Sequence, residues 1–274
     1  MPHRCMTDVQ KTSGQSRSER RASEAAEGPN SKPKPKRTPR ATGFKAWLTH
    51  RHDPLTSLLL TIPVFLTYHL GILLIDMRNG VDLVSGLTFR LLQHSLLAYI
   101  GVTLGYAVAI GLAVWVMRRR GTIKAAELLP VLGESVVLAL LMSVTVGWAT
   151  ARLVGAQTGP PPMGPLEKLV MAAGAGFHEE IVFRVLIFSG GTWLLKRAMK
   201  ESSELKPALA MALLSSLVFS AIHYVGPYGD PFALGSFVFR ALAGLYLVGV
   251  YRWRGFAVAV YTHMIYDLVV FFLR

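Results

Sequence analysis

Charged residues are scarce in this chain, and acidic residues are the scarcest of them. Asp, Glu, Lys and Arg make up 16% of the 274 residues, and hydrophobic residues make up 52%. Soluble domains average roughly 25% charged residues. The low charge disfavours a soluble globular domain and favours a protein embedded in a membrane.

Several catalytic and metal-binding signatures are also missing. The single cysteine, Cys5, excludes an intramolecular disulfide and a multi-cysteine metal site. There is no G-x-S-x-G nucleophile elbow, and residues 226–230 read GPYGD where an aspartyl intramembrane protease has G-x-G-D. His178 and Glu179 begin a zincin-like HExxH motif, but Val182 stands where its second histidine belongs.

The first 42 residues are predicted to form a disordered, basic, cytoplasmic tail. Residues 7–40 contain almost no large apolar side chain, so they cannot bury enough surface to offset the entropy of ordering. No apolar stretch follows within reach, so we do not expect a signal peptide. Residues 1–54 hold 12 of the 29 Lys and Arg residues. Basic residues in a tail and in membrane-flanking loops favour an orienting role over nucleic-acid binding.

Residues 43–274 are predicted to form one transmembrane helical domain. A spanning helix needs about 20 mostly apolar residues. Seven segments qualify: 55–75, 91–117, 128–149, 166–195, 207–226, 232–251 and 256–273. The sequence therefore predicts an all-α polytopic bundle of about seven spans (seven or eight), and no internal repeat indicates an inverted-repeat transporter.

The distribution of basic residues predicts the orientation. With the N-terminus inside, the inner segments hold 22 Lys and Arg residues and the outer segments hold five. Every loop then agrees with the positive-inside rule. We expect a multi-pass protein of the cell inner (plasma) membrane with a cytoplasmic N-terminus.

Ionisable side chains within the predicted spans are candidates for a functional site, because burying them in a bilayer is costly. They concentrate on three spans: Glu179, Glu180 and Arg184 on the fourth, His223 on the fifth, and His263 and Asp267 on the seventh. Glu134, alone on its span, is interpreted as structural or pore-facing.

The two adjacent glutamates are expected to differ in role. Glu180 and Arg184 are four residues apart on a helix, so they share a face and can form an ion pair. Glu179 is rotated by about 100° from Glu180 and lies outside that pair. A carboxylate in a low-dielectric pocket can act as a general base or acid near neutral pH.

The histidines and Asp267 allow several interpretations. His263 and Asp267 are also four residues apart, so they can orient one another or together donate to a developing oxyanion. His223, from a third helix, can share a water with Glu179. The alternatives are histidines that only bridge helices and a zinc ion held by Glu179, His223 and His263.

Taken in order, these motifs resemble those of the CPBP family. The matching pattern is Glu179-Glu180-x-x-x-Arg184, Phe219-x-x-x-His223 and His263-x-x-x-Asp267. The family includes the type II CAAX prenyl endopeptidases, bacteriocin-processing and immunity proteins, and abortive-infection proteins. The resemblance covers about residues 120–274, and the glycine-rich sixth span, with Arg240, Gly244 and Gly249, also looks like the family's.

The resemblance implies a glutamate-dependent intramembrane endopeptidase. We expect it to use no cofactor, because taking zinc ligands from Glu179, His223, His263 and Asp267 would leave little to act as base or oxyanion donor. Glu179 and His223 would activate the attacking water, and His263 and Asp267 would form the oxyanion site. Family members often have Asn at the Asp267 position, so a direct donor role requires a protonated Asp267; otherwise it orients His263. Glu180 and Arg184 would be supporting residues.

The expected partners are the lipid bilayer and a membrane-associated peptide or protein substrate. Removal of a bacteriocin leader, or of a C-terminal sorting signal as by a myxosortase, fits better than a CAAX substrate. Two alternatives remain: a non-enzymatic membrane immunity or interaction protein, and an ion or proton transporter that uses the same cluster as a relay.

Overall fold

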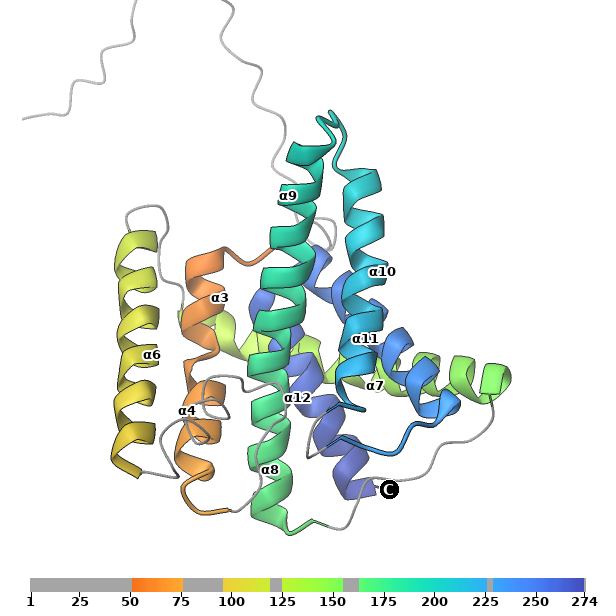
Figure 1. Cartoon of the computed structure of the whole chain (residues 1–274). Coiled ribbons are helices and arrows are strands. Elements are labelled where there is room, and N and C mark those ends of the chain that lie inside the picture. The colour runs from red at the N-terminus through yellow and green to blue at the C-terminus, as the bar shows by residue number, and fades with distance from the viewer. Residues whose placement is uncertain (1–50, 76–95, 119–124, 155–162, 226–228, 274) are drawn as a thin grey trace, which may run out of the picture. The chain divides into compact units, whose positions relative to one another are not determined.

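The computed structural model describes residues 51–75, 96–118, 125–154, 163–225 and 229–273. Within these ranges every regular element is helical, which confirms the predicted all-α fold (Figure 1). The predicted basic tail, residues 1–42, lies outside the described residues. The elements are α3 (Pro54–Leu60), α4 (Ile62–Gly71), α6 (Leu96–Met117), the short 3-10 helix η1 (Ala125–Glu127), α7 (Leu128–Val154), α8 (Pro165–Gly174), the π-helix η2 (Ala175–Gly190), α9 (Gly191–Ala198), α10 (Leu205–Ile222), α11 (Leu234–Arg254) and α12 (Phe256–Leu273).

Helices coincide with all seven predicted spans. Six helical segments among the described residues are long and apolar enough to cross a membrane. The remaining predicted span, 166–195, corresponds to α8, η2 and α9. These three elements join without a break, because the backbone at both junctions stays in the right-handed helical region. A polytopic helical membrane bundle is therefore confirmed.

Two spans differ in detail from regular α-helices. The first is divided at Thr61 into α3 and α4. Pro63, in the first turn of α4, has no backbone N–H to continue the bonding of α3. The fourth span contains sixteen residues of π-helix in η2, where each N–H bonds five residues back. An apolar run of this length does not distinguish the two bonding patterns, and π-helical turns occur frequently at functional sites.

Helix α12 is the central element of the bundle. It packs against α7, η2, α11, α8 and α3, and the side chains of residues 257–260 are fully buried. Helix α10 packs on both η2 and α11. The fourth predicted span, through η2, thus contacts both the fifth (α10) and the seventh (α12), so the three motif-bearing spans adjoin one another. His263 lies one turn beyond the most buried stretch of α12.

An ion pair fixes the start of α12 and explains Glu134. Arg254, at the end of α11, forms a bidentate pair with Glu134 of α7, with side chains 1% and 6% exposed. Gly255 follows with φ +100°, a conformation that favours glycine, and allows the chain to turn directly from α11 into α12. Glu134 is therefore structural, as one of its two interpretations predicted.

A glycine allows η2 to approach α12 closely beside the motif residues. A Cβ at Gly176 would lie 2.8 Å from the backbone oxygen of Val260 and 3.0 Å from Cβ of Met264. Backbone atoms cannot move aside as the end of a flexible side chain can. The spacing between Glu179 and Glu180 on η2 and His263 on α12 therefore depends on this glycine.

Substitution of Gly176 tests this dependence. We expect Gly176→Ala to lower the thermal unfolding temperature of the detergent-purified protein, since overpacking typically costs about 1–3 kcal/mol. Gly249→Ala is the matched control, because a Cβ there meets nothing within 4 Å, and alanine favours a helix over glycine. Equal unfolding temperatures for both variants would show that the close contact does not constrain the bundle.

The predicted orientation is testable with single cysteines in a Cys5→Ser background. Ser202, between α9 and α10, and Ala233, the N-cap of α11, are both exposed; Ser202 lies on a predicted inner loop and Ala233 at the predicted outer end of the span 232–251. In intact cells, a membrane-impermeant maleimide should label Ala233→Cys and spare Ser202→Cys until the membrane is permeabilised. The reverse labelling would invert the topology.

Candidate functional site

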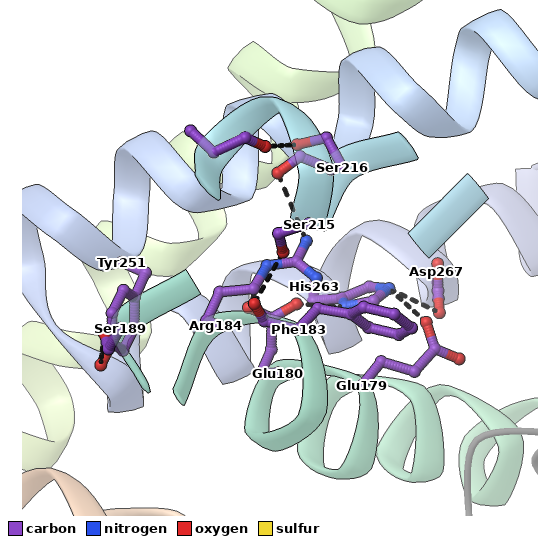
Figure 2. A network of polar contacts seen from close by, with 12 residues as sticks. Glu179, Glu180, Phe183, Arg184, Ser189, Ser215, Ser216, Tyr251, His263 and Asp267 are labelled. Carbon is purple, nitrogen blue, oxygen red and sulfur yellow. Dashed lines mark hydrogen bonds and ion pairs between the residues drawn. The ribbon is translucent and has the colours of Figure 1, made fainter. Parts of the chain in front are cut away.

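The polar motif residues of η2 and α12 face one another in the interior of the bundle. Figure 2 shows Glu179, Glu180 and Arg184 on η2 with His263 and Asp267 nearby. Their charges lie on two helices that are packed together. Five of the six predicted site residues therefore gather in one cluster.

A chain of three buried groups runs through this cluster. The Nε of Arg184 lies 3.0 Å from Oε2 of Glu180, and both side chains are 0% exposed. The other carboxylate oxygen of Glu180, Oε1, lies 2.8 Å from Nδ1 of His263. One carboxylate thus neutralises the arginine and also fixes the histidine ring, which determines where the second ring nitrogen points.

The second nitrogen of His263 faces the two remaining carboxylates. Its Nε2 lies 3.8 Å from Oε2 of Glu179 and 3.7 Å from Oδ2 of Asp267. Both separations exceed a direct hydrogen bond, and polar groups at such distances can be bridged by a water. The arrangement therefore sets two carboxylates and an imidazole nitrogen around one small volume.

Sequence reasoning predicted the Glu180–Arg184 pair but missed the contact between Glu180 and His263. One of the two interpretations of Asp267 was that it orients His263; in the structure the shortest side-chain bond of His263 goes to Glu180. Spacing within one span predicts partners on that span only. A contact between spans depends on how each helix is rotated in the bundle.

Phe219 of α10 connects the remaining predicted residue, His223, to the cluster. The ring of Phe219 contacts His223 and His263, with centroids 5.1 and 5.9 Å away, and the Arg184 guanidinium lies 4.8 Å from its centroid. A Cβ at Gly244 of α11 would lie 3.2 Å from this ring, so the glycine makes room for it. Phe219 therefore separates the two histidines and holds both in position.

His223 lies at the end of α10, where its ring is anchored on one side. Its Nδ1 is 2.7 Å from the backbone oxygen of Phe219, which leaves Nε2 for another partner. Glu179, Arg240 and His263 lie close enough to influence its charge. His223 therefore lies near Glu179, with which it was expected to share a water.

The segment after His223 is tied back to α11. The backbone N–H of Asp230 donates to the carbonyl oxygen of His223 at 2.8 Å, and the Asp230 carboxylate pairs with Arg240. The guanidinium of Arg240 also lies over the ring of Tyr224, 5.3 Å from its centroid. Arg240 lies inside a predicted span, and that position was the one sequence signal of this contact.

The side chains of the cluster become more exposed from Arg184 and Glu180 toward Asp267 and His223. Arg184 and Glu180 are fully buried, the Glu179 side chain is 6% exposed and the Asp267 side chain is 18% exposed. His223 is only partly buried. The accessible edge of the cluster therefore lies toward the C-terminal ends of α10 and α12. Among the residues that the structure describes, no group of three His, Cys, Asp or Glu side chains is arranged to hold a metal ion.

A comparison with protein families gives a match over part of the chain. Residues 161–269 match the family model described as type II CAAX prenyl endopeptidase Rce1-like. No curated protein and no solved structure matches the chain. The matched segment runs from just before α8 to the second half of α12, and it includes every candidate site residue discussed above. The resemblance to the CPBP family is confirmed over residues 161–269, the part of the chain that matches the Rce1-like family model.

Proposed function

We propose that this protein is an intramembrane endopeptidase in which Glu179 activates a water and His263 stabilises the resulting oxyanion. The family match supports a membrane peptidase of the CAAX type in general. One observation carries the finer assignment. His263 is held through Nδ1 by the buried Glu180–Arg184 pair, while its Nε2 faces Glu179 and Asp267 at less than 4 Å.

Glu179 serves as the general base of this mechanism. Its carboxylate takes a proton from the water, whose oxygen attacks the carbonyl carbon of the peptide bond. The same carboxyl group then passes the proton to the leaving amine, so that one residue completes both transfers. His223 assists through Nε2, which can bind the water because Nδ1 already faces the Phe219 carbonyl.

His263 and Asp267 stabilise the negative charge on the carbonyl oxygen. In the protonated ring both N–H groups donate: Nδ1–H to Glu180, and Nε2–H to the oxyanion. Because Glu180 already orients the ring, Asp267 is not needed for that purpose. A protonated Asp267 can then donate a second hydrogen bond to the oxyanion, as the amide of an asparagine would.

A purely structural cluster requires fewer charges than this one contains. Glu180 is by itself enough to neutralise Arg184, and both side chains are fully buried. Glu179 and Asp267 lie at the accessible edge beside His263, where additional carboxylates add repulsion to the buried site. Their presence supports catalysis over interhelical bridging as the role of the cluster.

The position of the accessible edge indicates from which side of the membrane a substrate reaches the site. It lies toward the ends of α10 and α12 that are opposite the basic segments 196–206 and 252–254. By the positive-inside rule those segments are cytoplasmic, so a substrate reaches the site from the outer half of the membrane. A membrane-anchored leader or C-terminal sorting signal fits this access better than a cytoplasmic prenylated C-terminus.

Replacing each glutamate by glutamine separates the two roles. Glu179→Gln should accumulate with an unchanged unfolding temperature and lose all cleavage. Glu180→Gln leaves the buried Arg184 without a counter-charge, a loss that typically costs about 3–5 kcal/mol, so we expect reduced accumulation and a lower unfolding temperature. Cleavage is measured by mass spectrometry of new peptide termini in membranes of cells that express each variant.

Glu201→Gln is the control for the loss of a carboxylate. Glu201 lies outside the cluster, and the ion pair that it forms with Lys206 at the surface is long, at 3.8 Å. It should match the wild type in every measurement. A stable, active Glu180→Gln variant together with a Glu179→Gln variant that fails to accumulate would reverse the two assignments. If the new peptide termini still appeared in cells that express Glu179→Gln, the proposed role of Glu179 in cleavage would be wrong.

A chelator tests whether hydrolysis proceeds without a metal. A catalytic zinc site usually uses three protein ligands, and taking them from Glu179, His223, His263 and Asp267 leaves little to act as base or oxyanion donor. The purified protein should cleave a substrate found in the terminal analysis equally well with and without EDTA, and elemental analysis should find no stoichiometric zinc. Activity that is lost in EDTA and restored by Zn²⁺ would show instead that the enzyme uses zinc, with His223 and His263 as its ligands.

A further inference from the structure

A cavity lined by several cations lies at the end of the bundle that carries the basic loops. It is half open and about 230 Å³ in volume. Its walls come from the junction of η2 and α9, from the C-terminal turn of α11, from the start of α10 and from Arg51 ahead of α3. None of the candidate catalytic residues lines it, so the cavity is separate from the peptidase site.

Positive charge dominates the cavity lining. Arg51, Lys196 and Arg252 all line it, and Glu204, 3.7 Å from Arg252, is the single acidic group among the described residues that line it. Lys196 and Arg252 lie in the last turns of their helices, where a cation is also favoured by the helix dipole. That preference explains each cation alone, but not the convergence of three cations from separate segments on one hollow.

The polar groups between the cations support a bound anion. Thr192 lines the cavity and is 4% exposed, and its hydroxyl has no hydrogen-bond partner among the described residues. Ser189 donates to the hydroxyl oxygen of Tyr251 at 3.0 Å, and the Arg51 guanidinium lies 5.8 Å from the centre of the Tyr251 ring. Cationic and hydroxyl groups are the usual ligands of a phosphate.

The wall that faces outward is apolar and aromatic. Trp193 lines the cavity and is 64% exposed, and its neighbour Leu194 is 60% exposed. Tryptophan is enriched at the level of lipid headgroups. A ligand in this cavity therefore meets cations on its inner side and a lipid-facing apolar surface at its rim.

We infer that this cavity binds the phosphate headgroup of an anionic phospholipid in the cytoplasmic leaflet. The phosphate lies among Arg51, Lys196 and Arg252, and the acyl chains leave past Trp193 into the bilayer. Basic pockets between membrane helices on the cytoplasmic side are suited to such headgroups. The inference goes beyond the proposed peptidase function and does not depend on it.

The test uses the full chain, purified in a neutral detergent. Phosphatidylglycerol, added at increasing mole fraction to the micelles, should raise the unfolding temperature in a saturable way, whereas phosphatidylcholine should not. In the double variant Lys196→Gln with Arg252→Gln, half-saturation should need at least about tenfold more phosphatidylglycerol, since two charge-assisted contacts are lost. The control Lys200→Gln with Lys206→Gln removes the same charge outside the cavity and should behave as the wild type.

Two further measurements complete the test. Soluble phosphates distinguish a lipid headgroup from a free phosphate, and mass spectrometry of the wild type gives a result that does not depend on the folding of a variant. Glycerol phosphate and inorganic phosphate should give no comparable rise, because they lack acyl chains; an equal rise would identify a soluble phosphate ligand and overturn the lipid assignment. Native mass spectrometry of the wild type should count one retained phosphatidylglycerol. No retained lipid, or equal weakening in both double variants, would also overturn it.

Discussion

The buried Arg184–Glu180–His263 chain is the interaction on which the candidate site depends. A guanidinium with 0% exposure in the interior of a membrane bundle requires a counter-charge, and Glu180 supplies it from one turn away on the same helix. The second oxygen of that carboxylate reaches across to His263. The charge balance that stabilises the arginine thus also orients the imidazole, so that stability and the geometry of the site cannot be changed independently.

Small residues allow the helices to come close enough for this chain to form. Gly176 lets η2 approach the backbone of α12, and Gly244 leaves space for the ring of Phe219 between α10 and α11. Gly249, in the same glycine-rich helix, contacts nothing that a methyl group would disturb. Membrane helices lack a strong hydrophobic drive to associate, so such close backbone contacts contribute much of the packing. Of the two glycines that the family resemblance emphasised, only Gly244 therefore lies at a helix contact.

The spans could be predicted from the sequence because long apolar runs have few alternatives in a bilayer. Helix α12 occupies the predicted residues 256–273, and the Glu180–Arg184 pair follows from helical spacing. The bond from Glu180 to His263, the placement of Phe219 between the histidines, and the π-helical bonding of η2 were not predictable in this way. The first two depend on how neighbouring helices rotate and approach one another, on which local spacing carries no information. The third was hidden because an apolar run does not distinguish π-helical from α-helical bonding.

One continuous helix connects the candidate site to the basic cavity. Glu179 and Glu180 lie on η2, and the same helix continues through Ser189 and Thr192 to Lys196 near the end of α9. Its position against α12 is set beside the site by the tight contact at Gly176. A phospholipid bound among Arg51, Lys196 and Arg252 would hold the far end of this helix against α11. Because the helix is unbroken between the two points, a restraint at the cavity limits its rotation at the site, and with it the direction in which Glu179 faces His263. Lipid composition would then affect turnover through the orientation of one carboxylate, without any contact between lipid and substrate.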